Sequence, residues 1–129
     1  KAKDDCRTNW VKPEYTTEQT VTPAAEQARD KNSLLNHYKN LIRFRNSSSA
    51  LTFGVLKPVE LSNKGISAFV REHQKESLLV LHNLSTTPAT VAVPANLRDY
   101  RQVAFKHNQA SIKGGNIELP SYSTLILMK

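Results

Sequence analysis

The segment that decides the fold is ESLLVLHNLS, residues 76–85, in which apolar side chains follow one another almost without interruption. A strand with one solvent-facing side alternates between apolar and polar residues, whereas a strand covered on both faces is apolar nearly throughout. The segment therefore predicts a central strand of a sheet that has protein on both of its faces.

Short segments rich in Val, Ile, Leu and Phe lie on both sides of this strand, separated by clusters of Pro, Gly, Asn and Ser. We expect turns at Lys64-Gly65 and Gly114-Gly115, because glycine adopts a positive φ without steric cost. Pro58 indicates an edge strand or a bulge, since it has no amide hydrogen to donate. Seven strands without intervening helices predict a mainly β fold, an antiparallel Greek-key β-sandwich. The seven segments are residues 54–61, 65–73, 76–85, 89–94, 100–107, 115–120 and 123–129.

Ahead of the strands lies SLLNHYKNLIRFR, residues 33–45, in which apolar side chains recur every three or four positions. This period predicts an amphipathic helix over about residues 31–46, with Asp30, Asn32 and Ser33 as candidate capping residues. The serines that follow Asn46 are expected to end it. Its apolar stripe consists of Leu34, Leu35, Tyr38, Leu41 and Ile42.

Residues 1–29 contain many threonines and no sustained periodicity, which predicts an extended loop with Trp10 and Tyr15 as its large apolar anchors. Loops of this length usually line a functional site or wrap a neighbour. The only cysteine is Cys6, so no disulfide forms within the chain. No apolar run approaches membrane-spanning length, and we expect no membrane partner.

The net charge of +7 raises the question of an anionic partner such as a nucleic acid. Basic residues are spread along the chain, however, and the apolar stripe of the helix must be buried. No helix-turn-helix, zinc finger or aromatic strand motif accompanies it. Basic side chains flanking an amphipathic helix are the better explanation, and we expect no nucleic-acid partner.

Residues that carry enzymatic chemistry are sparse. The carboxylates fall mostly in the leading loop or at strand ends, and the four histidines lack the spacing of a zinc site. No glycine-rich phosphate loop or nucleophile elbow occurs. We therefore expect no catalytic, metal-binding or cofactor-binding residue in this chain. His82, inside the central segment, is predicted to be a strand residue bonded to a neighbour.

A carbohydrate-binding β-domain is the alternative function, because small β-sandwiches often present aromatic side chains to sugars. Tyr100 and Tyr122 are the candidate platforms, although tyrosines in such positions more often belong to the core or to hydrogen-bonded structure. The sequons at Asn46 and Asn83 are interpreted as chance matches.

The chain begins KAKDDCRTNW and its only methionine is Met128, so we expect a processed chain or a piece of a longer protein. DKNSLLNHYKNLIRFRNSSSALTFG, residues 30–54, resembles the segment that closes the catalytic barrel of the α-amylase family, glycoside hydrolase family thirteen. Bacterial members carry the pattern DPNSLLNYYKKLIxLRxxxxAL..G there. ISAFVRE, LLVLHNLS and IELPSYSTLILMK resemble the C-terminal β-domain of the same enzymes, whereas residues 97–115 match little.

The resemblance implies that residues 1–50 form the end of the catalytic (β/α)₈ barrel and residues 51–129 its C-terminal β-sandwich domain. The family's catalytic Asp, Glu and Asp then lie upstream, so this chain alone is expected to be non-catalytic. The longer protein is expected to be a retaining α-glycosidase. Whether it is an α-amylase, an oligo-1,6-glucosidase or a transferase stays open.

The missing barrel of the same polypeptide is the expected partner, and the stripe Leu34, Leu35, Tyr38, Leu41 and Ile42 its expected contact surface. Trp10 matches a loop at the substrate side of the barrel. Without the barrel, the exposed stripe predicts self-association of the chain, because large apolar patches are rare on monomers. The resemblance also allows an α-glucan ligand and a calcium ion in the longer protein, and favours an extracytoplasmic location.

Overall fold

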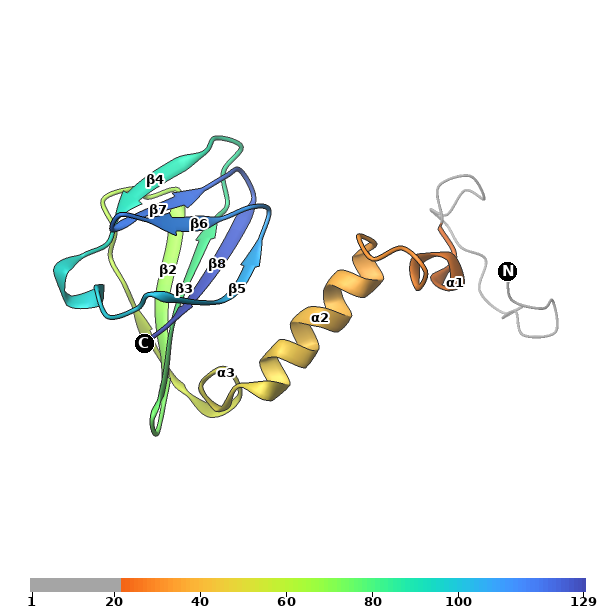
Figure 1. The fold of residues 1–129 in the computed structure, drawn as a ribbon, viewed down its shortest axis with the longest axis horizontal. Coiled ribbons are helices and arrows are strands. Elements are labelled where there is room, and N and C mark those ends of the chain that lie inside the picture. Colours follow the sequence, from red (N-terminus) through yellow and green to blue (C-terminus); the bar gives the residue numbers. More distant parts are fainter. Residues whose placement is uncertain (1–21) are drawn as a thin grey trace, which may run out of the picture. The chain divides into compact units, whose positions relative to one another are not determined.

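A computed structural model describes residues 22–129 (Figure 1). The chain divides into two compact units, residues 1–43 and 44–129, and the division falls within one helix. The predicted domain boundary after residue 50 depends on the resemblance to the barrel and stays a prediction. Trp10, Tyr15 and Cys6 lie outside the described residues.

The described part of the first unit contains α1 (Ala24–Gln27) and most of α2 (Leu34–Ser47). Ser33 caps α2, since its hydroxyl oxygen accepts a hydrogen bond from the Asn36 amide at 3.2 Å while its proton goes to the Gln27 carbonyl at 2.6 Å. The Asn36 side chain donates to the Gln27 and Asp30 carbonyls at 2.9 and 2.7 Å. These bonds fix the corner between the two helices, and the predicted helix is confirmed with its start at Leu34.

The second unit is the β-domain, which forms two antiparallel sheets as predicted. The five-stranded sheet has the order β1-β2-β3-β8-β5 and the three-stranded sheet has the order β4-β7-β6. The strands are β1 (Val55–Pro58), β2 (Ile66–His73), β3 (Glu76–Asn83), β4 (Ala89–Ala92), β5 (Gln102–His107), β6 (Ser111–Lys113), β7 (Asn116–Leu119) and β8 (Ser123–Met128).

The central strand is confirmed, because β3 lies in the middle of the five-stranded sheet and its residues 78–81 are buried on both faces. Pro58 lies in β1 at the sheet edge, as predicted. Gly114 and Gly115 form a turn with φ of 56° and 83°. Gly65 is also in a turn, but its φ is not in the left-handed region, so that part of the expectation was wrong.

The main core lies between the two sheets (Figure 1). The five-stranded sheet contributes Leu79, Leu81, Leu125 and Leu127, and the three-stranded sheet contributes Val91, Ile117 and Leu119. A second, smaller cluster covers the opposite face of the five-stranded sheet, which we call the outer face. It contains Ala50, Leu78, Val80 and Ile126, with Phe44 and Phe105 packed beside them.

Four elements were not predicted from the sequence, namely α1, α3, β6 and the short 3-10 helix η2 (Ala95–Leu97). α1 lies within residues 1–29, which were expected to form an extended loop, so that expectation was wrong for residues 24–27. β6 has only three residues and pairs with β7 across the Gly114-Gly115 turn. The short helix α3 (Ser49–Phe53) begins directly after α2, at the serines that were expected only to end a helix. Ser48 is its N-cap, and the hydroxyl oxygen accepts a hydrogen bond from the Leu51 amide at 3.0 Å.

Candidate functional site

One face of α2 carries large apolar side chains that no described residue covers. Leu34, Tyr38 and Ile42 follow one another at intervals of four residues, so they lie on one side of the helix. They are 67%, 57% and 56% exposed. Leu35 and Leu41, the other members of the predicted stripe, are half-buried. Leu34, Tyr38 and Ile42 thus form an apolar surface without a partner among residues 22–129, and the role of the stripe as a contact surface stays a prediction.

Helix α3 is held at both ends by the hairpin of β2 and β3. At its first turn, the Glu76 carboxylate accepts hydrogen bonds from the Ser49 hydroxyl at 2.6 Å and the Ala50 amide at 2.9 Å. At its last turn, the Arg71 guanidinium donates to the Ala50 and Leu51 carbonyls, both at 3.1 Å. An anion at the start and a cation at the end satisfy backbone groups that a helix leaves unpaired. The hairpin thereby fixes α3 on the outer face.

The Glu76 contacts also affect its ionisation. Partial burial acts to raise the pKa of this carboxyl, but hydrogen bonds from Ser49, Ala50 and Ser48 outweigh it and leave the pKa below its ordinary value. The ionised form is therefore the one that holds α3. The stabilisation by ionised Glu76 is fully present at a pH above the ordinary pKa of a glutamate in the unfolded chain. It is lost as the pH falls through the lowered pKa of folded Glu76.

We expect Glu76→Gln to lower the free energy of unfolding by about 1 kcal/mol, because a charge-assisted acceptor becomes a neutral one. Urea denaturation followed by circular dichroism at pH 7 would measure the change. Glu60→Gln is the matched control, since Glu60 is exposed and is expected to stay within about 0.5 kcal/mol of the unaltered chain. Equal losses in both variants would contradict the role assigned to Glu76.

The outer face is only partly covered. Phe44, at the end of α2, stacks on Phe105 with ring centroids 5.3 Å apart. Phe53, at the end of α3, and Val55 and Leu56, in the edge strand β1, are exposed.

His82 is half-buried on the outer face, where its ring lies beside Phe69 with ring centroids 6.0 Å apart. Its Nδ1 is 2.9 Å from the Thr124 hydroxyl oxygen, which confirms that it is a strand residue bonded to a neighbour. Burial lowers the pKa of His82 below its ordinary value of 6.5. The unfolded chain therefore takes up a proton at this residue at a higher pH than the folded chain does.

We expect this difference to make stability fall as the pH decreases from about 6.5 towards the lower pKa of folded His82. Above that range the imidazole is neutral in both states and contributes no pH dependence. Unfolding free energies of the chain and of a His82→Gln variant, measured from pH 7.5 to 5, would isolate the effect. The same pH slope in both proteins would contradict it.

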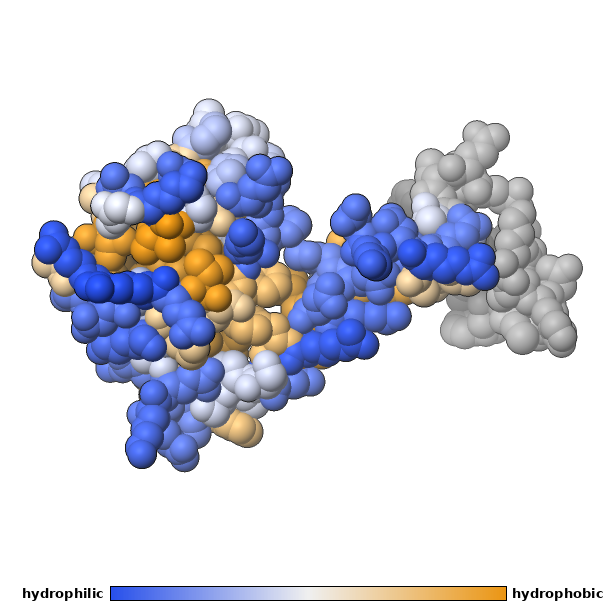
Figure 2. All heavy atoms as spheres, viewed as in Figure 1, coloured by the Kyte–Doolittle hydropathy of each residue, from blue (hydrophilic) through white to orange (hydrophobic). Residues whose placement is uncertain are grey.

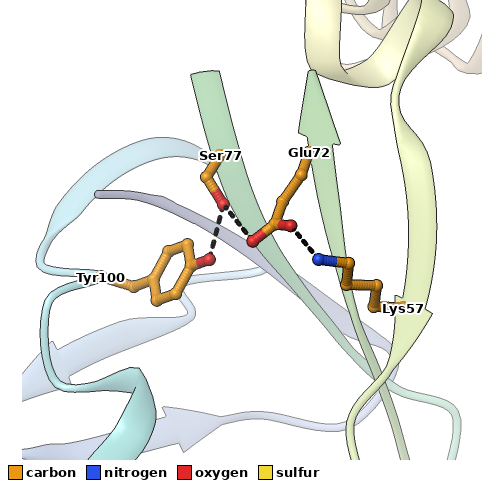
Figure 3. Close-up of polar contacts among 4 residues, drawn as sticks. All are labelled: Lys57, Glu72, Ser77 and Tyr100. Atoms are coloured by element: carbon orange, nitrogen blue, oxygen red, sulfur yellow. Dashed lines mark hydrogen bonds and ion pairs between the residues drawn. The ribbon is translucent and has the colours of Figure 1, made fainter. Parts of the chain in front are cut away.

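The two candidate sugar platforms differ in exposure. Tyr100 is only 3% exposed and belongs to the core, so it is not a platform, and the more frequent role of such a tyrosine is confirmed here. Its hydroxyl is 2.6 Å from the Ser77 Oγ, which in turn donates to Glu72, and Glu72 forms an ion pair with Lys57 (Figure 3). This network ties the segment before β5 to β1, β2 and β3. Tyr122 is 61% exposed and remains a candidate platform.

The ion pair at the end of this network shifts both of its partners. A hydrogen bond to Glu72 raises the pKa of Lys57, and the same bond lowers the pKa of the Glu72 carboxyl. Both groups are exposed to solvent, and an exposed ion pair adds little to the free energy of unfolding. The pair therefore serves mainly to orient the two side chains between β1 and β2.

The Asn83 side chain, at the end of β3, is 1% exposed and makes five hydrogen bonds. Its amide nitrogen donates to the carbonyls of Thr87, Leu119 and Pro120 at 2.8–3.0 Å. Its oxygen accepts from the Ser85 amide and hydroxyl at 3.0 and 2.7 Å. The Asn83 side chain therefore has no free amide group in the folded chain, and its bonds join the end of β3 to the segments after β3 and β7.

A cavity of about 590 Å³ opens at the rim of the β-domain. It is lined by the end of β4, by the β6–β7 turn and by the segment between η2 (Ala95–Leu97) and β5. Figure 2 shows an apolar area on the β-domain bordered by hydrophilic residues. The lining residues are Ala92, Val93, Arg98, Tyr100, Arg101, Ile112, Gly114, Gly115 and Asn116.

Within residues 22–129, no group of three or more His, Cys, Asp or Glu side chains is arranged to hold a metal ion. The helices of this same range are too short or too polar to cross a bilayer.

Comparison with known proteins identifies the β-domain. Residues 66–126 match the family described as the C-terminal domain of α-amylase SusG. The chain is 27% identical over 125 residues to α-amylase 3 of Dictyoglomus thermophilum, covering 97% of this chain and 25% of that protein. It is 35% identical over 92 residues to α-amylase SusG of Bacteroides thetaiotaomicron, covering 65% of this chain and 13% of that protein. The chain thus spans a quarter or less of the length of these relatives.

The fold agrees with these matches. The trehalulose synthase MutB of Pseudomonas mesoacidophila superposes with a TM-score of 0.71 over 82% of this chain and 20% of its own, at 23% identity. The two antiparallel sheets, the sequence matches and the motifs in residues 30–54 and 76–85 all lead to one assignment. The chain is the C-terminal part of an α-amylase-family protein, glycoside hydrolase family thirteen.

Proposed function

We propose that this chain is the non-catalytic C-terminal region of an α-glucan-hydrolysing, retaining α-glycosidase, and that it packs against and stabilises a catalytic barrel. The family assignment supports the activity of the longer protein, since two of its relatives are named α-amylases. The exposed face of α2 supports the packing role, because Leu34, Tyr38 and Ile42 need a partner that residues 22–129 do not supply.

The carboxylates of the described residues support a non-catalytic role. Glycoside hydrolysis by this family's mechanism needs two carboxyl groups positioned on either side of the scissile bond. Glu72 is paired with Lys57, and Glu76 is bonded to α3. We expect the isolated chain to release no reducing sugar from soluble starch. Release above that of a heat-denatured sample would contradict this part of the proposal.

The packing role is tested in the longer polypeptide from which the chain comes. Replacing Leu34, Tyr38 and Ile42 together by aspartate is expected to lower its thermal stability and its starch-hydrolysing activity, because three charges would be buried at the barrel contact. In the isolated chain the same replacements lie on an exposed face, and the β-domain should unfold as before.

Asn40→Asp is the matched control in both proteins. Asn40 is exposed on α2, and a shift of two residues from Tyr38 places it on another side of the helix. A longer polypeptide that tolerates the triple variant as well as it tolerates Asn40→Asp would refute the packing role.

Binding of α-glucan by the β-domain is the alternative, for which the exposed ring of Tyr122 is the remaining observation. Affinity electrophoresis in gels that contain starch would separate the two proposals. Retardation of the chain that is abolished by Tyr122→Ala would support glucan binding, whereas unretarded migration would eliminate it.

A further inference from the structure

The cavity at the rim of the β-domain has features of a ligand site that the packing role does not use. Its volume of about 590 Å³ is in the range that accommodates a small molecule. Six of its nine lining residues come from residues 97–115, between η2 and β7.

Two arginines supply the only charges among the lining residues. Arg98 and Arg101 are exposed, and neither takes part in an ion pair within residues 22–129. The Arg101 Nε donates to the Arg98 carbonyl at 2.8 Å, which orients the guanidinium and leaves its two Nη groups for a ligand. Asp99 lies between them in sequence but does not line the cavity. The cavity thus offers guanidinium donors and no carboxylate acceptor.

The segment that carries these arginines is anchored in the core. Leu97 and Tyr100 are buried, and the Tyr100 amide donates to the Leu97 carbonyl at 3.1 Å. The Arg101 amide donates to the Met128 carbonyl at 3.2 Å, which joins the segment to β8. The Tyr100 hydroxyl is bonded to Ser77 in the network of Figure 3. The backbone of both arginines is therefore fixed before a ligand binds, which reduces the loss of conformational entropy on binding.

The opposite wall is apolar and open. The Val93 amide donates to the Gly115 carbonyl at 3.0 Å, so the end of β4 and the β6–β7 turn are joined. Gly114 and Gly115 have no atoms within 4 Å of the position of a Cβ, and Val93 and Ile112 supply the apolar contact area. A carbon skeleton fits this wall better than a highly hydroxylated one.

We propose that the cavity binds a small organic anion, with its carboxylate or phosphate on Arg98 and Arg101 and its apolar part against Val93 and Ile112. Guanidinium groups bind such anions through charge-assisted hydrogen bonds. A neutral glucan is disfavoured here, because sugar hydroxyls also need acceptors and the one lining tyrosine is buried.

Titration of the ¹⁵N-labelled chain with phenyl phosphate and with benzoate, followed by amide chemical shifts, tests this assignment. Saturable shifts are expected for Val93, Arg101, Ile112 and Gly115. The two ligands show which anionic group is preferred. Inorganic phosphate is expected to bind more weakly than phenyl phosphate, and equal affinity would overturn the assigned apolar part. Maltose should cause no saturable shift, and binding of maltose as tight as that of the anions would overturn the anion assignment.

The double variant Arg98→Gln/Arg101→Gln is expected to weaken phenyl phosphate binding at least about tenfold, because two charge-assisted hydrogen bonds are lost. Arg43→Gln/Arg45→Gln, which removes the same charge from α2, should bind as the unaltered chain does. If the double variant loses its dispersed spectrum, Arg98→Gln alone serves, since the Arg98 side chain has no partner among the described residues. The proposal would be overturned if a folded Arg98→Gln/Arg101→Gln or Arg98→Gln variant bound phenyl phosphate as tightly as the unaltered chain. It would also be overturned if both double variants lost phenyl phosphate binding.

Discussion

An Asn83→Leu variant is expected to lose about 4 kcal/mol of unfolding free energy relative to the unaltered chain. The leucine removes the Asn83 donor from the carbonyls of Thr87, Leu119 and Pro120, and the acceptor from the Ser85 amide. The Thr87 and Pro120 carbonyls keep hydrogen bonds from the Ser85 and Ser123 hydroxyls, so the Leu119 carbonyl and the Ser85 amide lose most. Each buried polar group that loses its partner costs about 1–3 kcal/mol, and a packed apolar side chain does not compensate for several of them. Urea denaturation followed by the strand signal in circular dichroism measures the loss.

The other sequon provides the matched control. Asn46 is exposed on α2, so Asn46→Leu is expected to stay within about 0.5 kcal/mol of the unaltered chain. Asn83→Asp should also be destabilising, because it replaces the three-bond donor by a carboxylate that faces three carbonyl oxygens. An Asn83→Leu variant as stable as Asn46→Leu would show that the five hydrogen bonds add little to the fold.

A Gly54→Ala variant is expected to lose about 3 kcal/mol of unfolding free energy. Gly54 follows α3 with φ −69° and ψ 152°, an ordinary backbone conformation, so conformational strain is not the reason. The reason is space, since a Cβ at this position would lie 2.2 Å from the Ala50 carbonyl oxygen and 2.9 Å from that of Glu72. Both neighbours are backbone atoms, so α3 would have to move away from β2.

The control for this effect is Gly65→Ala. The nearest atom to its Cβ position is the Asn63 side-chain oxygen at 3.2 Å, which can rotate away, and its φ is not left-handed. Thermal unfolding of the two variants side by side should show a large fall in Tm for Gly54→Ala and a small change for Gly65→Ala. Equal shifts would mean that the close approach at Gly54 is relieved at little cost.

Much of the β-domain could be predicted from the sequence because its strands carry local signals. The apolar run of β3 indicated a position in the middle of a sheet, and Pro58 indicated an edge. β6 was not predicted because three residues are too few to show a period, and its pairing depends on β7. α3 was not predicted because Ser48 was interpreted as the end of the preceding helix, whereas its side chain caps the start of α3.

The apolar stripe of α2 and the cavity could not be fully predicted from the sequence, for two different reasons. Period alone indicated the stripe of α2, but which of its residues are exposed depends on the surrounding fold, and Leu35 and Leu41 turned out to be half-buried. The cavity brings together residues from positions 92–116, and no local pattern in the sequence connects them. Tyr100 shows the same limit, since only the tertiary structure buries its ring against the core.

The strand order has a consequence for synthesis. β8 lies between β3 and β5, although it is the last strand of this chain. During translation, β1, β2 and β3 can pair as they leave the ribosome, but β5 has no neighbour in its sheet until residues 123–128 have emerged. A ribosome that stalled before these residues would therefore present an open sheet edge on β3 and an unpaired β5, which are sites where chaperones and proteases engage incomplete chains.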